Sequence, residues 1–527
     1  MSDAMEGSPK NDSPQQNASY RSGFAFGILS FLALAVLGLA STIVTARIYG
    51  VTIIGEFALT MAPVTLLWVL STAKEQAALI KEITGLPRRH PRVTELFGAV
   101  FTFSSALTVF ASLLAAGGVW LLFRGPLEVP QLVTPAFVSL AGYAIVTNTA
   151  WNFDAIFSAF VAGRQLFWVR LHEALSFLLI AIVVGLKWQS VWGLVVATIG
   201  GSLTSLLHRV IIVRHFARLR LGLSEYRQGL QALPGLLHFG LRIAPGSIAQ
   251  GISQQAGIWA IRVFGGSVGL VGAYSRAQTV PERVQQVNLR IVEVLYPTLV
   301  GRRGRGDHEG FDRALTDTIR YTLTGLLLMA AVIGGAAEPI LRLFGPGFSR
   351  ATGVLMLLML YPAANSVAIA QTQALLAVNL PGRTSIVAIA RMVFTVAITV
   401  VLTPTIGITG PAIALLAGAL LDVIWKTIVL RSYLSTALAT IWPQRQRLAL
   451  VGGYLGGFAT AYSVTHALPS TGGLLVGLVL ATFTCLGLFI LLGAINHRDR
   501  DRVSELFASV KARGERRQAA AAAPVGS

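Results

Sequence analysis

The sequence predicts an all-α polytopic membrane protein with 14 transmembrane helices. The 527 residues are 54% hydrophobic and only 12% charged, a balance typical of chains that lie mostly in a bilayer. Apolar runs of about 17–28 residues follow one another with short breaks, and each is long enough to cross a membrane as a helix. The predicted spans lie near residues 23–46, 57–73, 97–122, 134–161, 166–186, 191–213, 240–262, 269–299, 318–338, 352–378, 385–405, 408–430, 448–467 and 471–494.

The placement of basic residues predicts the orientation of these spans. The net charge is +19, from 42 Lys and Arg against 23 Asp and Glu. If the N-terminus is cytoplasmic, three basic residues fall within a span and most of the others on the inner side. The positive-inside rule then predicts that both termini are cytoplasmic. The basic segments are too short for a nucleic-acid-binding domain, so no nucleic acid is expected as a partner. Only six basic residues fall outside: Arg47, Arg124, Lys187, Arg262, Arg342 and Arg350.

An internal repeat predicts two similar halves. Ala46-Arg47-Ile48-Tyr49-Gly50 returns as Ile261-Arg262-Val263-Phe264-Gly265, and Gly55-Glu56-Phe57 returns as Gly272-Ala273-Tyr274. This offset contains six helices, an even number, so the two copies share one orientation, as parallel repeats do. We therefore expect two six-helix lobes followed by two further helices. The predicted parts are a disordered cytoplasmic N-terminus (1–20), an N-lobe (21–213), an interfacial linker (214–239), a C-lobe (240–431), spans 13 and 14 (432–495) and a basic cytoplasmic tail (496–527).

Three arginines in the eighth predicted span provide the main indication of function. Arg276, Arg283 and Arg290 recur every seven residues, which places them within about 40° of one face of a helix. Arginine stays protonated at any accessible pH, and each one costs roughly 2.5–3.5 kcal/mol at the centre of a bilayer. A wet internal cavity that binds an anion is the favoured environment. Snorkelling of the outer two, with Arg283 paired to a carboxylate such as Glu282, is the alternative.

Other polar residues within the spans are candidates for the same cavity. Gln254, Asn152 and Gln286 could bind the hydroxyl groups of a substrate, although bonds between helices would also explain them. Arg47 and Arg262 occupy matching repeat positions and could line the exit side of the cavity or stabilise turns. Asp154 either pairs with an arginine or binds a proton or sodium ion. Glu293 could pair with Arg290 or take part in ion coupling.

The sequence provides no means for catalysis. The chain has no phosphate-binding Gly-x-x-x-x-Gly-Lys-Ser/Thr motif, no His-Glu-x-x-His and no Cys-x-x-Cys, and Cys485 is its single cysteine. ATP hydrolysis and metal catalysis therefore have no sequence signature here. We expect no catalytic residues, no metal and no cofactor other than H⁺ or Na⁺ as a coupling ion. The predicted external loops are also too short to hold a catalytic domain.

Several segments resemble the multidrug/oligosaccharidyl-lipid/polysaccharide (MOP) exporter superfamily, in particular its bacterial polysaccharide flippase branch, and are similar also to the lipid II flippases. The matching segments are Ala46-Arg47-Ile48-Tyr49-Gly50, Val271-Gly272-Ala273-Tyr274, Tyr296-Pro297, Ile340-Leu341-Arg342-Leu343-Phe344-Gly345 and Gly407-Ile408-Thr409-Gly410-Pro411. The resemblance implies two lobes that open alternately to each side of the membrane. It also implies a polyprenyl-pyrophosphate-linked glycan as cargo and, for Arg276, the position of a cavity arginine.

The sequence therefore predicts a flippase that moves a lipid-linked oligosaccharide to the outer leaflet of a bacterial inner membrane for cell-surface polysaccharide biosynthesis. Glycosyltransferases and polymer-assembly proteins are the expected protein partners. Three alternatives stay open: a cation-coupled multidrug antiporter of the same superfamily, a membrane enzyme that polymerises glycans, and a scaffold without transport activity. The arginines argue against a cationic cargo, and the short external loops argue against the enzyme.

Overall fold

The computed structural model describes most of the chain as helices joined by short turns. The predicted linker 214–239 and tail 496–527 lie almost wholly outside the described residues. So do positions 1–13 of the predicted N-terminal segment, whereas residues 14–20 already belong to the first helix. The described residues are 14–70, 75–83, 86–88, 90–160, 162–216, 244–293, 295–434 and 444–495.

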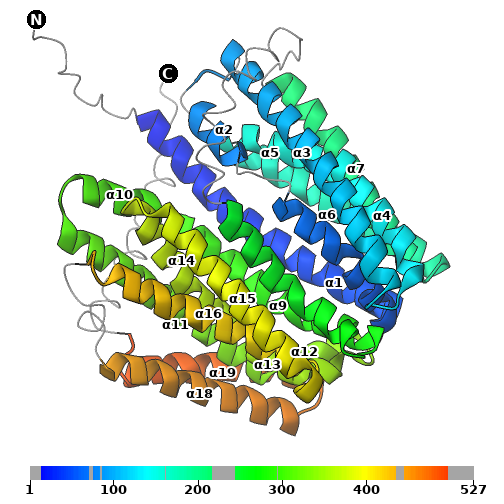
Figure 1. The fold of residues 1–527 in the computed structure, drawn as a ribbon. Helices are drawn as coiled ribbons and strands as arrows, with labels where there is room; N and C mark the ends of the chain where they lie inside the picture. The colour runs from blue at the N-terminus through cyan, green and yellow to red at the C-terminus, as the bar shows by residue number, and fades with distance from the viewer. Residues whose placement is uncertain are drawn as a thin grey trace, which may run out of the picture. The chain divides into compact units, whose positions relative to one another are not determined.

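The described ranges contain helices and no strand, which agrees with the predicted all-α class (Figure 1). Residues 244–263 are helical as well, and η2 is a short π-helix inserted between α4 and α5. The other helices are α1 (Pro14–Leu70), α2 (Glu75–Ile83), α3 (Pro91–Arg124), η1 (Pro130–Leu132), α4 (Val133–Gly142), η2 (Tyr143–Thr147), α5 (Asn148–Ala159), α6 (Gly163–Lys187), α7 (Val191–Phe216), α9 (Val268–Glu293), α10 (Leu295–Gly304), α11 (His308–Gly335), α12 (Ala337–Phe344), η3 (Phe348–Ala351), α13 (Thr352–Leu358), α14 (Tyr361–Ala377), α15 (Pro381–Ile406), α16 (Thr409–Leu430), α18 (Gln444–Ala467) and α19 (Thr471–Leu491).

Eleven helices in the described residues are long and apolar enough to cross a membrane, so the chain is a multi-pass membrane protein. The number differs from the 14 predicted spans for physical reasons. The first two predicted spans fall in α1, which consists of two helices joined at Gly50, where φ is 76° and ψ is 171°. The helix at 244–263 and α9 are too polar to be recognised as spans from composition. The count of 14 therefore stays a prediction.

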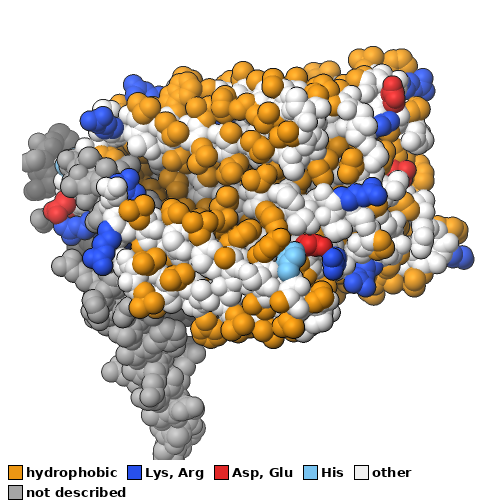
Figure 2. Space-filling model, turned by 90° about the horizontal axis from the view of Figure 1, so that it is seen from below, with side chains coloured by type: hydrophobic (Ala, Val, Ile, Leu, Met, Phe, Trp, Pro, Cys, Tyr) orange, Lys and Arg blue, Asp and Glu red, His pale blue; other side chains and the backbone are white. Residues whose placement is uncertain are grey.

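The surface is also that of a membrane protein. Leu113, Leu186, Phe483 and Leu491 are each more than two-thirds exposed, and hydrophobic side chains cover most of the face in Figure 2. In water such a surface would promote aggregation, whereas in a bilayer these side chains contact lipid.

The chain forms two compact units, which differ in their boundaries from the two predicted lobes. Unit 1 comprises residues 1–283, 341–358 and 379–426, and unit 2 comprises residues 284–340, 359–378 and 427–527. In unit 1, α1 packs on α6, α6 packs on α7, and Tyr49 donates a hydrogen bond to the carbonyl of Ala181 (2.9 Å). The division into two six-helix lobes remains a prediction.

Unit 2 contains the two helices that follow the repeat. α18 and α19 pack against each other and along α11, where small residues permit close contact. A methyl group on Gly457 would lie 2.7 Å from the Cβ of Cys485 on α19 and 3.3 Å from that of Ala331 on α11. Close approach of backbones at small residues is the usual means of association for helices in lipid.

Candidate binding pocket

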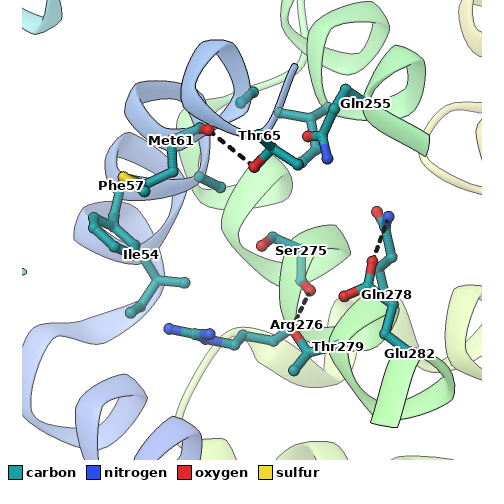
Figure 3. A pocket seen from close by; sticks show the side chains of 13 residues that line it. Ile54, Phe57, Met61, Thr65, Gln255, Ser275, Arg276, Gln278, Thr279 and Glu282 are labelled. Atoms are coloured by element: carbon teal, nitrogen blue, oxygen red, sulfur yellow. Dashed lines mark hydrogen bonds between the residues drawn. The ribbon is translucent and has the colours of Figure 1, made fainter. Parts of the chain in front are cut away.

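Unit 1 contains a pocket of about 150 Å³ between α1, α9 and the helix at 244–263 (Figure 3). The wall formed by α1 is largely apolar, whereas α9 contributes most of the polar side chains. A pocket for a drug-sized ligand usually has about 300–1,000 Å³, so this one can hold only a small part of a larger molecule. It is lined by Ile54, Phe57, Ala58, Met61, Ala62, Thr65, Gln255, Ile258, Ser275, Arg276, Gln278, Thr279 and Glu282.

Two glycines bring the walls of the pocket together. A Cβ on Gly55 of α1 would overlap the carbonyl of Val268, and a Cβ on Gly272 of α9 would overlap the carbonyl of Val51. The backbones of α1 and α9 can therefore touch only because both positions lack a side chain. Beyond this crossing the two helices enclose the pocket.

Arg276 is the central feature of the pocket. Its side chain extends from α9 toward Ile54 of α1 (Figure 3), and the residue is only 8% exposed. Its Nε has no hydrogen-bond partner among the described residues, and no described carboxylate forms an ion pair with it. A buried guanidinium without a counter-charge is costly, and a bound anion would relieve that cost.

Arg283 lies one step further along the arginine series. It is half-buried beside the first segment of α1, where a Cβ on Gly38 would lie 3.4 Å from its Cζ. Its positive charge acts on Arg276, so the two cations reinforce one another as an anion-attracting region. The side chains of Arg290 and Glu293 lie outside the described residues, although both positions belong to α9.

Glu282 and Gln278 add hydrogen-bonding groups that the sequence did not single out as a site. Gln278 Nε2 donates to Glu282 Oε1 (2.9 Å) and to the carbonyl of Gln254 (3.2 Å). Glu282 thus faces the pocket and accepts a hydrogen bond from an amide, not from Arg276. Gln278, Thr279 and Glu282 follow Ser275 at helical spacings of three, four and seven residues, and this periodicity could have identified them in the sequence.

The other predicted substrate-binding residues lie elsewhere. Gln254 supplies a carbonyl to Gln278, and its neighbour Gln255 lines the pocket. Gln286 lies on α9 beyond the lining residues. Asn152 is buried in a network in which its Nδ2 donates to the carbonyl of Asn148 (3.1 Å) and its Oδ1 accepts from Gln76 (3.3 Å).

Arg47 and Arg262 also lie outside the pocket lining, and both donate to backbone carbonyls. Arg47 Nε donates to Leu343 O (2.7 Å), and Arg262 Nε donates to Leu127 O (2.8 Å). Arg262 also donates through Nη1 to Gly266 O (3.3 Å) and through Nη2 to Glu128 O (3.2 Å). A direct role in substrate binding stays a prediction for both.

Asp154 is paired with arginine, the first of the two roles considered for it. Its carboxylate lies 2.8 Å from Arg209 Nε and 3.5 Å from Arg170 Nη2, and Arg209 also lies 3.2 Å from Glu173. A second buried group combines Asp422 with Arg391 (3.0 Å) and Lys426 (2.7 Å). Arg209 and Lys426 occupy matching positions of the repeat. Among the described residues no cluster of His, Cys, Asp or Glu could hold a metal ion.

A family model described as polysaccharide biosynthesis protein matches residues 83–351, just over half of the chain. The chain belongs to this family. It is thus a multi-pass membrane protein of a polysaccharide biosynthesis family, as the sequence predicted at this level.

Solved structures share the fold at low sequence identity. A structure of the lipid II flippase MurJ in an inward closed conformation is 13% identical, with a TM-score of 0.66, over 90% of this chain and 99% of the other. An inward-facing multidrug resistance MATE transporter of the MOP superfamily is 15% identical, with a TM-score of 0.61, over 77% and 98% of the two chains. A search of curated proteins found no match to the chain.

Proposed function

We propose that this membrane protein is a transporter, a flippase for a polyprenyl-pyrophosphate-linked oligosaccharide, moving it from the cytoplasmic to the outer leaflet of a bacterial inner membrane. The observation that supports this most directly is Arg276, a buried guanidinium that has no counter-charge among the described residues and is directed into a pocket. A diphosphate offers several acceptor oxygens and a permanent negative charge, the chemistry that arginine binds best. Membership of a polysaccharide biosynthesis family agrees with a glycan as cargo.

The size of the pocket determines which part of such a cargo it would hold. At about 150 Å³ it accommodates a phosphate group with the nearest part of a sugar, while the remaining glycan occupies wider space and the prenyl chain stays in lipid. Ser275, Gln278 and Thr279 then supply donors and acceptors for hydroxyl groups. In this mechanism Arg276 and Arg283 replace the water that solvates the diphosphate, and the repeat copies rock around this fixed site.

The membrane potential can drive this movement without ATP. An anion that leaves a negative cytoplasm gains about 2.3 kcal/mol per charge for each 100 mV. Coupling to H⁺ or Na⁺ through Asp154 or Glu293 remains part of the proposal as an alternative source of energy. Both termini in the cytoplasm, and glycosyltransferases as partners, belong to the same proposal.

The test is transport of a fluorescent lipid-linked oligosaccharide in proteoliposomes. We expect Arg276→Ala to lower the rate at least tenfold, because one charge-assisted hydrogen bond to the cargo is worth roughly 1.5–3 kcal/mol. Arg276→Lys should retain part of the activity, since it keeps the charge but loses the bidentate geometry. Arg124→Ala is the matched control, because Arg124 lies outside the pocket against Trp120. Normal transport by a correctly folded Arg276→Ala variant would contradict the proposal.

Glu282 favours a second candidate, a cation-coupled multidrug antiporter. A carboxylate that faces the same pocket could bind a cationic drug or a coupling ion. In the same proteoliposomes, an antiporter would depend on Glu282 and move a cationic dye, whereas the flippase would depend on Arg276 and move the anionic glycolipid. Dye transport that survives Arg276→Ala but not Glu282→Gln would favour the antiporter.

A further inference from the structure

Arg47 and Arg262 form a reciprocal pair of contacts between the two repeat copies. Arg47 of the first copy donates to the carbonyl of Leu343 in the second, and Arg262 of the second copy donates to the carbonyl of Leu127 in the first. Arg262 also donates to the carbonyl of Glu128 (3.2 Å). Arg262 Nη1 also donates to the carbonyl of Gly266 (3.3 Å) in the turn after its own helix, whereas the bonds to Leu343, Leu127 and Glu128 join parts of the chain that are distant in the sequence.

The residues whose carbonyls accept these bonds, Leu127 and Leu343, also occupy matching positions of the internal repeat. The spacing between Leu127 and Leu343 along the chain exceeds that between Arg47 and Arg262 by a single position, and both spacings agree with the offset of the internal repeat. The two bonds are therefore the same contact, made once in each direction. Two of the carbonyls lie where helices end, Leu343 at the end of α12 and Leu127 just after α3. Such carbonyls lack an intrahelical donor and attract a cation.

The crossing of α1 and α9 at Gly55 and Gly272 is a second, independent contact between the copies. These glycines also occupy matching positions of the repeat. A side chain on either would overlap the backbone of the opposite helix. The two helices therefore touch at equivalent points, near the end of unit 1 that carries Arg47 and Arg262.

We propose that Arg47 and Arg262 form a two-armed latch that holds the repeat copies together on the predicted outer side of the membrane and releases when the transporter opens there. When the arms are released, water can solvate both guanidiniums and both carbonyls, so each bond has a modest net strength and the latch is reversible. The latch does not depend on the nature of the cargo, because it consists of protein groups alone.

The experiment measures access to the pocket from outside. In a Cys485→Ala background, Met61→Cys places one reporter thiol on the pocket wall. Its reaction with a membrane-impermeant thiol reagent is followed in right-side-out vesicles without cargo. We expect Arg47→Met and Arg262→Met each to raise the rate of labelling about tenfold, and the double variant to raise it about a hundredfold, because two parallel charge-assisted bonds are removed. Arg124→Met, an arginine of the same predicted side, should leave the rate unchanged.

Each outcome supports or overturns the latch. A double variant that labels at the parent rate overturns it, and so does faster labelling only in inside-out vesicles. If the methionine variants fail to accumulate, the Arg47→Lys/Arg262→Lys protein decides, because lysine keeps the charge but lacks Nε. Faster labelling of that protein supports the latch, and an unchanged rate overturns it. A failure of the flippase proposal would appear as normal glycolipid transport by Arg276→Ala, or as no transport by the parent protein, whatever the labelling rates of the latch variants, so the two failures are distinguishable.

Discussion

Replacing Arg209 should destabilise the protein far more than replacing Arg170, although both arginines contact Asp154. The Arg209 side chain is 1% exposed and contacts Asp154, Glu173 and Ser205. The Arg170 side chain is 42% exposed and approaches Asp154 at 3.5 Å. Burial thus differs strongly between two partners of one carboxylate, so the pair forms a controlled comparison within a single network.

The magnitudes follow from this difference in burial. Breaking a buried ion pair by removing one partner costs about 3–5 kcal/mol, because the remaining charges are left in a poor solvent. A half-exposed pair with a long contact is worth about 0–1 kcal/mol. We therefore expect Arg209→Met to cost roughly 3–5 kcal/mol and Arg170→Met at most about 1 kcal/mol. Asp154→Asn combined with Arg209→Met should recover part of the loss, since one orphaned charge is then removed.

The assay is the temperature at which half of the purified protein loses its monodisperse chromatographic peak in detergent. Arg209→Met should lower this midpoint by several degrees, and Arg170→Met should leave it within about one degree. Equal midpoints for the two variants would refute the argument from burial. A folded Asp154→Asn variant whose transport no longer responds to ion gradients would show that Asp154 serves coupling, not only pairing with Arg209.

Three further predictions concern other contacts. Gly272→Ala should impair closure of the crossing between α1 and α9, because its methyl group would overlap the carbonyl of Val51; labelling of Met61→Cys from outside should then increase, and an unchanged rate would contradict the assigned contact. Gly457→Val should lower the thermal midpoint by several degrees, because its side chain would overlap Cys485 on α19 and overpacking is destabilising. Gly487→Val is the matched control: this position has open space, so the midpoint should change little. His466→Ala should change the midpoint by about a degree or less, because its contact with Glu338 (3.4 Å) is partly exposed and exposed pairs contribute little; a large loss would show that this pair holds α12 against α18.

The sequence predicted the helical membrane fold well, because the features that indicate it extend over many residues. Apolar runs of membrane length, separated by polar breaks, constrain helices directly, and most helix positions agree with the predicted spans. α9 coincides with the eighth predicted span, although its arginines, glutamines and glutamates make it too polar to count as a span by composition alone. The physical reason is its position: it is covered by α1 and the helix at 244–263, so its polar face meets a pocket instead of lipid.

The site was harder to predict, because helical periodicity shows which residues share one face of a helix but not which residues pack against that face. The sevenfold spacing placed Arg276, Arg283 and Arg290 together; of the two whose side chains are described, Arg276 lines the pocket and Arg283 does not. Nothing local to the sequence could show that the carbonyls of Leu127 and Leu343 lie within reach of Arg262 and Arg47, because these contacts join distant parts of the chain. The pairing of Asp154 with Arg209 likewise joins two different helices.

The repeat separates what maintains the fold from what gives the pocket its chemistry. Glycines at the helix crossing and arginines at the latch occur in both copies, because both copies must make the same contact. The pocket walls also use equivalent positions, in the same register as Gly55 and Gly272, yet their side chains differ. The first copy presents apolar or neutral groups, and the second presents polar and charged ones. In the proposed function, binding of an anion is thus a property of α9 through Arg276, added to a symmetric framework. The paired lining positions are Ala58 and Ser275, Met61 and Gln278, Ala62 and Thr279, and Thr65 and Glu282.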